Sequence, residues 1–264
     1  NMGICKWIGG IAGFMAFGPL GALAGYALGA LVENVNDKIE KGGRVFEQNG
    51  SEMADDHYGQ RNSFLFSLLV MASYIIRADG KVMHSEMEYV RRFLRLNFGS
   101  VAESEGNQIL LRLFEERKRM DSANPNAFRT TIQDCGAQIR NNMTYEQRLQ
   151  LLEFLASIAK SDGNVCKEEV AALKEVAFSM GLSDTEVDSM LSLGGESLDE
   201  AYKVLEIDSS ATDDEVKAAY RKMALKHHPD RVATLGEDVR KAAEEKFQKI
   251  NSAKEKIFSA RGMK

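Results

Sequence analysis

Two groups of residues in this chain of 264 residues have types and spacing that suit chemistry or specific binding. The tripeptide His228-Pro229-Asp230 places an imidazole and a carboxylate on either side of a proline, which disfavours helical geometry at the residue before it. With His227 it forms a His-His-x-Asp cluster, which is also compatible with a fragment of a metal site or with chance. The second group is a set of four carboxylates, whose oxygens suit a hard divalent cation: Asp79, Glu86, Asp162 and Glu169.

Neither group has the pattern of an enzyme active site. The sequence contains no Gly-rich phosphate loop, no nucleophile elbow and no H-E-x-x-H helix. Its three cysteines show no C-x-x-C spacing, so neither a zinc site nor a disulfide framework is indicated. The net charge of −5 argues against nucleic acid as a partner. We therefore expect a binding protein and not an enzyme.

A helix is predicted immediately before the tripeptide. Apolar residues between Val216 and His227 recur at three- and four-residue steps, which is typical of a surface helix with one buried face. Thr212 precedes three acidic residues and is typical of an N-cap, so the helix is expected to begin near Asp213. Four basic side chains occupy the other faces of this helix: Lys217, Arg221, Lys222 and Lys226.

Two further helices are predicted around this segment. Leu198, Tyr202 and Leu205 suit a short helix upstream, and apolar residues from Ala243 to Ile257 recur at helical spacing downstream. Antiparallel packing of the two longer helices would expose the H-P-D loop between them. With these elements, residues 198 to 258 closely resemble a J-domain of the DnaJ family, through A-Y-K-V-L-E-I-D-S-S-A-T-D-D-E-V-K-A-A-Y-R-K-M-A-L-K-H-H-P-D-R and E-K-F-Q-K-I-N-S-A-K-E-K-I.

The resemblance implies that the chain stimulates ATP hydrolysis by a DnaK-type chaperone. His228, Pro229 and Asp230 would be indispensable, and the four basic side chains of the preceding helix would dock on an acidic surface of that partner. An ordinary solvated helix face is the alternative interpretation of those charges. The sequence departs from the family pattern at three positions: Glu206 replaces a usual Gly, Lys254 a usual aromatic residue, and Arg231 a usual Lys.

The middle of the chain contains an internal repeat. The segments I-R-A-D-G-K-V-M-H-S-E-M-E-Y-V from Ile76 and A-K-S-D-G-N-V-C-K-E-E-V-A-A-L from Ala159 superpose at an offset of 83 residues, so that Asp79 corresponds to Asp162. In each copy an apolar helix leads through Asp-Gly and Val into a second helix. This doubled unit resembles the TerB-like (tellurite-resistance) all-helical domain.

Two interpretations of the repeated carboxylates remain open. In the structural one, Gly permits the turn, Asp stabilises it and Val fills the core. In the other, Asp79, Glu86, Asp162 and Glu169 form a divalent-cation site, although neither copy has the ligand spacing of an EF-hand. The second interpretation leads to an alternative function, in which a metal-binding or stress-response TerB-type module carries an accessory J-domain.

The N-terminal part of the chain is apolar. No charged residue occurs in residues 7–32, and a helix of that length would extend about 39 Å, more than the ~30 Å hydrocarbon core of a bilayer. Rows of glycines at four-residue spacing favour close helix packing, so this segment is also a candidate for homodimerisation. A helical hairpin broken at Gly18-Pro19 and a signal peptide cleaved after Ala24 are the alternatives.

The flanking charges predict the orientation of a membrane-spanning segment. Lys38, Lys41 and Arg44 follow it and only Lys6 precedes it, which favours a single-pass protein in the cytoplasmic membrane with its C-terminal part in the cytoplasm. The order of parts resembles the DjlA-like, membrane-anchored group of the DnaJ family. We expect an all-α fold divided into an apolar anchor (residues 1–33), a polar linker (34–62), a TerB-like helical domain (63–193) and a J-domain hairpin (198–264).

Overall fold

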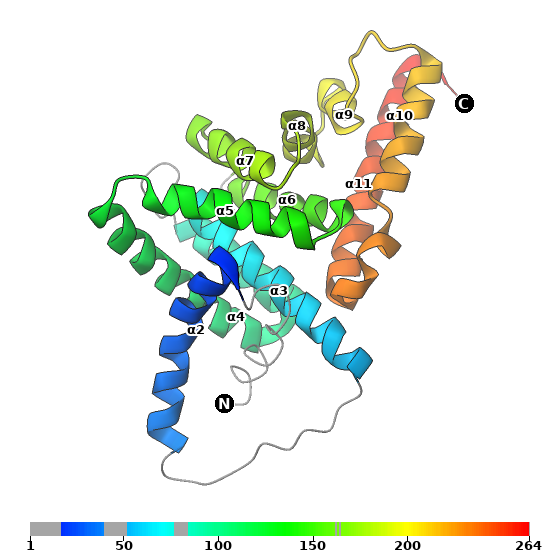
Figure 1. Ribbon diagram of the computed structural model, residues 1–264. Coiled ribbons are helices and arrows are strands. Elements are labelled where there is room, and N and C mark those ends of the chain that lie inside the picture. Colours follow the sequence, from blue (N-terminus) through cyan, green and yellow to red (C-terminus); the bar gives the residue numbers. More distant parts are fainter. Residues whose placement is uncertain (1–16, 40–51, 77–83, 162, 164, 264) are drawn as a thin grey trace.

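The structure is a computed structural model that describes residues 17–39, 52–76, 84–161, 163 and 165–263. Within these ranges all regular secondary structure is helical, as the sequence predicts (Figure 1). The elements are α2 (Gly18–Ile39), α3 (Glu52–Ile75), α4 (His84–Ala123), α5 (Ala127–Asn142), α6 (Tyr145–Ala159), α7 (Lys167–Ser179), α8 (Asp184–Ser192), α9 (Leu198–Val204), α10 (Asp213–Lys226), the 3₁₀ helix η1 (Pro229–Leu235) and α11 (Glu237–Arg261).

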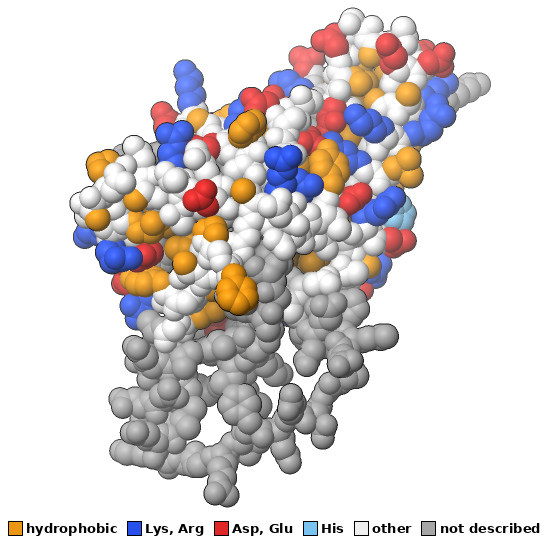
Figure 2. All heavy atoms as spheres, viewed as in Figure 1, with side chains coloured by type: hydrophobic (Ala, Val, Ile, Leu, Met, Phe, Trp, Pro, Cys, Tyr) orange, Lys and Arg blue, Asp and Glu red, His pale blue; other side chains and the backbone are white. Residues whose placement is uncertain are grey.

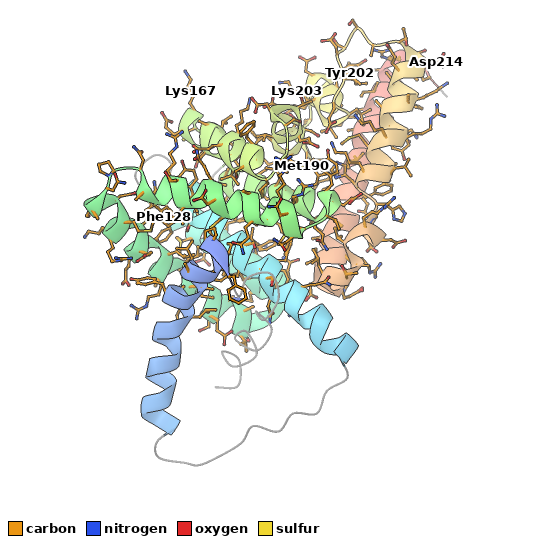
Figure 3. The ribbon with its side chains drawn as sticks, in the orientation of Figure 1. Phe128, Lys167, Met190, Tyr202, Lys203 and Asp214 are labelled. Atoms are coloured by element: carbon orange, nitrogen blue, oxygen red, sulfur yellow. The ribbon has the colours of Figure 1, made fainter. Side chains whose placement is uncertain are left out.

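Helix α3 is the centre of a bundle formed by α2 to α8. Its residues 64–75 are all buried, because α4, α5, α6 and α7 pack around it. A helix that is apolar on every side can be accommodated only in such a position. Phe128 at the start of α5 is buried in the same core (Figure 3).

The described part of the internal repeat forms a helix-turn-helix unit. In the second copy, Gly163 has a φ of 88°, a left-handed conformation that favours glycine, and Val165 packs against the core. Glu169 lies at the third position of α7 and accepts a hydrogen bond from the Cys166 N–H at 2.7 Å, which completes a capping box. The matching residue of the first copy, Glu86, lies at the third position of α4. The second copy therefore supports the structural interpretation of the turn.

The apolar N-terminal segment is described only in part. Residues 18–32 lie in α2, which packs Leu20, Leu23 and Ala27 into the core beside α4 and α5. Gln138 of α5 joins its first turn, accepting a hydrogen bond from the Leu20 N–H at 3.0 Å and donating one to the Phe17 carbonyl at 2.8 Å. Among the described helices, none combines the length and hydrophobicity needed to cross a membrane.

The expected polar linker is shorter than the sequence indicates. Helix α2 continues to Ile39 and α3 begins at Glu52, so both ends of residues 34–62 are helical. Residues 40–51 lie outside the described ranges. Asn62, placed in the linker by its polarity, is instead buried in α3. Polarity therefore misplaces this boundary, because residues 59–62 of α3 are polar or small and are still partly or fully covered by the rest of the protein.

The C-terminal helices form a hairpin that packs on the bundle. Helices α10 and α11 contact each other, while α9 lies against α8 and α11. The opposite end of the hairpin, at η1, contacts α3 and α6. Asp214 marks the start of α10 at the outer end of the hairpin (Figure 3).

Candidate partner-binding site

The H-P-D tripeptide begins η1 and presents its two polar side chains to solvent. Pro229 is the first residue of η1, where a missing N–H costs nothing, and is buried. The side chains of His228 and Asp230 are 51% and 78% exposed. Nδ1 of His228 accepts a hydrogen bond from the Asp230 N–H at 3.3 Å and lies 3.6 Å from the Asp230 carboxylate. The imidazole and carboxylate are therefore held together on an accessible, capped turn.

The adjacent histidines have opposite environments. His227 is buried, and neither of its ring nitrogens has a hydrogen-bond partner among the described residues. Burial, together with the positive charges of Lys246 and Lys226, holds the pKa of His227 well below its usual value, so this ring is neutral. The His228 ring instead lies 6.1 Å from the Phe247 ring, centroid to centroid. Only His228 is placed to contact another protein.

Helix α10 begins where the sequence predicts and carries an exposed basic face. The Thr212 hydroxyl accepts a hydrogen bond from the Glu215 N–H, and the Glu215 carboxylate accepts one from the Thr212 N–H at 2.7 Å. Arg221 and Lys222 are exposed and Lys217 is half-buried. These three have no ion-pair partner within the described ranges. They are therefore available to an acidic surface.

The prediction that Lys226 belongs to this exposed face is wrong for the described conformation. Its side chain is only 8% exposed, and Nζ lies 2.7 Å from Glu186 of α8 and 2.6 Å from Glu206. Nζ also lies 5.5 Å from the centre of the Tyr145 ring. The helical pattern places Lys226 on the polar side of α10, but that end of the helix is covered by the bundle.

Lys226 and its two carboxylate partners form a largely buried charged cluster, and the exposed Tyr145 lies at its edge. We call these four residues the Lys226 clamp: Lys226, Glu186, Glu206 and Tyr145. Burial alone would raise the pKa of Glu186, but hydrogen bonds from Lys226 and from the Tyr145 hydroxyl hold it below its usual value. Burial alone would likewise lower the pKa of Lys226, but its two carboxylate partners raise it. Both ions stay charged, and the clamp joins α10 to the bundle.

Glu206 explains one departure from the J-domain pattern. Its φ is 58°, in the left-handed region where a side chain costs about 1–2 kcal/mol and glycine is favoured. The residue that replaces the usual Gly thus adopts a glycine conformation, and its carboxylate contacts Lys226. The strained conformation is offset by a contact that a glycine could not make.

A second polar contact region holds α11 and η1 against the bundle. Nζ of Lys246 is buried and donates a hydrogen bond to the Gln150 side chain at 2.7 Å. Arg61 of α3 pairs with Asp238 of α11 at 3.0 Å, and Gln147 donates to the Thr234 hydroxyl at 3.4 Å. The sequence pattern did not single out these residues, because partners so far apart in the chain leave no local signal.

The four carboxylates proposed for a cation cannot be assembled from the described residues. Asp79, Asp162 and the side chain of Glu86 lie outside the described ranges. The Glu169 carboxylate caps α7. No cluster of three or more potential metal-ligating side chains occurs in the described part of the chain. The cation site stays a prediction.

Comparisons with known proteins match three consecutive parts of the chain to three families. Residues 2–44 match the co-chaperone DjlA transmembrane domain, residues 66–191 match the tellurite resistance protein TerB, and residues 200–260 match the DnaJ domain. No significant match to a solved structure is found.

Similarity to curated proteins extends over nearly the whole chain. The co-chaperone protein DjlA of Photobacterium profundum is 27% identical over 98% of this chain and 99% of the relative. The protein of the same name from Shewanella oneidensis is 29% identical over 86% of this chain and 88% of the relative. A chaperone protein DnaJ of Fusobacterium nucleatum is 52% identical, over 20% of this chain and 13% of the relative.

Proposed function

We propose that this chain, a DjlA-like co-chaperone of the DnaJ type, stimulates the ATPase of a DnaK-type chaperone through its J-domain. The observation that supports this function best is the accessible pair of His228 and Asp230, held on a capped turn that directly follows α10, the helix with three unpaired basic side chains. The chain performs no bond-making step itself.

Stimulation requires contacts that favour one state of the partner. A bound protein shifts the partner toward its hydrolysing state only if it interacts better with that state than with the resting one. A loop fixed by η1 and α11 can supply such contacts, because it loses little conformational freedom on binding. His228 and Asp230 are the groups assigned to this selective contact.

The basic face of α10 provides the electrostatic part of binding. Charges on an exposed face attract an oppositely charged surface over about 8–10 Å at physiological ionic strength, and they raise the association rate more than the affinity. Lys217, Arg221 and Lys222 are assigned to this role. Lys226 is engaged in its clamp and contributes to orientation instead.

Reversing the charge of Arg221 and Lys222, with both changed to Glu, is expected to lower the association rate with a DnaK-type chaperone by about tenfold at low salt. The loss should diminish as salt is added, since screening weakens the same attraction. The measurement is the association rate of the partner with the full-length protein in lipid vesicles, by surface plasmon resonance.

The matched control for this experiment reverses Lys118 and Lys167, two exposed lysines of α4 and α7, and produces the same change in net charge. An equal loss in the control would assign the effect to overall charge. An unchanged association rate in the α10 variant would remove α10 from the binding site.

Residues 7–32 are proposed to tether the protein to the cytoplasmic membrane, with the TerB and J-domains in the cytoplasm. In the membrane, Leu20, Leu23 and Ala27 of α2 would exchange their contacts with α4 and α5 for contacts with lipid. The match of residues 2–44 to the DjlA transmembrane domain and the basic residues after the apolar segment support this orientation. Self-association through the glycine-rich segment belongs to the same proposal.

Protease accessibility tests the orientation. Protease added to intact cells is expected to leave the C-terminus uncut, and protease added after lysis is expected to cleave it. Cleavage of the C-terminus in both samples would place the C-terminal domains outside the cytoplasm.

A further inference from the structure

A groove separates α10 from the bundle on the side that carries the basic face. Its volume is about 480 Å³, and residues of both domains line it. Lys222 and Lys226 form the α10 wall, and Arg140 and Phe178 belong to the opposite wall. The basic face of α10 therefore continues across the groove onto the surface of the TerB domain.

Exposed apolar groups accompany this groove. Phe178 of α7 is 80% exposed, and Leu225 of α10 is 68% exposed. Phe178 lines the groove itself, whereas Leu225 lies outside its lining, on the helix that carries the basic face. A single exposed apolar residue needs no explanation, but a large one that lines a basic groove suits a binding surface. Figure 2 shows Lys and Arg side chains gathered along the α10 side of the hairpin and on the neighbouring surface of the bundle, with hydrophobic side chains between them.

The charge of the groove is positive. Arg140 is exposed and, like Lys222, has no ion-pair partner among the residues that the structure describes. The two carboxylates at the groove, Glu186 and Glu206, are both engaged by Lys226. These two carboxylates are only 6% and 11% exposed, whereas Arg140 and Lys222 are exposed, one on each wall. The three cationic and two acidic side chains of the lining give a net charge of +1, and the charges that face solvent complement an acidic surface.

The Lys226 clamp fixes the relation between the two walls. Lys226 comes from α10, Glu186 from α8 and Tyr145 from the start of α6, and all three meet at the base of the groove. Arg148 adds a hydrogen bond to the Met180 carbonyl and lies over the Tyr145 ring. A partner would thus meet a preformed surface, which saves the cost of ordering two separate domains.

We propose that the TerB domain forms part of the docking surface for the DnaK-type chaperone. The acidic surface of the partner that binds α10 extends across the groove, where carboxylates pair with Arg140 and an apolar side chain packs on Phe178. This inference rests on the proposed function. It adds a contact outside the J-domain, and it gives the TerB domain a direct role in partner binding.

Site-specific photo-crosslinking in the full-length protein tests this surface. With benzoylphenylalanine at position 178, illumination in the presence of a DnaK-type chaperone is expected to give a covalent product of the two proteins. Position 225 on α10 should give the same product, and position 111, an exposed leucine of α4, should give none. A product from position 225 but not from position 178 would overturn the inference and leave the proposed function intact.

Crosslinking between two copies of the chain at position 178 would also overturn the inference, since it would assign the groove to self-association. No partner product from either position would count against the proposed function itself.

A paired substitution provides an independent readout. Changing Phe178→Ala together with Arg140→Gln is expected to raise the concentration for half-maximal ATPase stimulation about fivefold or more, with the maximal stimulation unchanged. The control pair is Leu111→Ala with Lys118→Gln, which removes the same kinds of group from α4. An unchanged half-maximal concentration, with thermal unfolding like that of the native protein, would contradict a role for the TerB surface.

Discussion

Replacing His228 with glutamine is expected to leave the chain bound to a DnaK-type chaperone while its stimulation of ATP hydrolysis falls by about tenfold or more. A tenfold fall corresponds to about 1.4 kcal/mol of lost transition-state stabilisation. The His228 side chain is half exposed and its ring lies 6.1 Å from the Phe247 ring. A glutamine oxygen can accept the hydrogen bond that the Asp230 N–H donates to Nδ1 of His228, so the fold should change little. The measurement is single-turnover ATP hydrolysis at saturating concentrations of the variant.

The control for His228→Gln is Arg231→Gln, which alters an exposed residue of the same 3₁₀ helix. Arg231 should tolerate the change because the proposed selective contact is made by His228 and Asp230. Full stimulation by His228→Gln would show that the accessible imidazole is not the activating group. Loss of both binding and stimulation would assign the imidazole to docking instead.

A pH dependence of stability is the second large effect, and it arises from Lys246. Burial lowers the pKa of this lysine from 10.5 to about 8, although Glu153 offsets part of the shift. Between these values the unfolded chain binds more protons than the folded chain, so stability is gained as pH rises and lost as pH falls toward 8. The shift corresponds to about 3 kcal/mol across this window.

The Lys246→Met variant should lack this dependence, because methionine fills similar space without a titrating group. Calorimetric unfolding at several pH values between about 8 and 10 compares the two proteins, and the difference between them isolates Lys246. Lys249→Met changes an exposed lysine of the same helix and should retain the native slope. If native protein and Lys246→Met showed the same slope, Lys246 would not be buried against the bundle in solution.

Local signals explain what could be predicted from the sequence. Thr212 and Glu215 form a capping box within four residues, so the start of α10 is encoded in its own segment. The turn in the second copy of the repeat likewise needs only a glycine at a left-handed φ, Gly163, and a valine that reaches the core, Val165. The all-α fold, the exposed imidazole and most of the basic face follow from such short-range patterns.

Docking of the two domains could not be predicted in this way. The burial of Lys226 depends on Glu186, forty residues away in α8, and a periodic pattern contains no information about which polar face another domain covers. Glu206 is recognisable in the sequence as an unusual residue at its position. The physical reason for a glutamate there is its contact with Lys226, which only the structure shows. For η1 a signal was present, since Val232 and Leu235 are spaced by one 3₁₀ turn and both are buried.

The most direct test of the central claim is single-turnover ATP hydrolysis by a DnaK-type chaperone, measured while the native full-length protein in lipid vesicles is titrated in. We expect a saturable acceleration of ATP hydrolysis that weakens with added salt, because the basic face of α10 attracts the partner electrostatically. A hydrolysis rate that stays constant over the whole titration, with the protein folded and inserted, would contradict the assignment of a co-chaperone function to His228, Asp230 and α10.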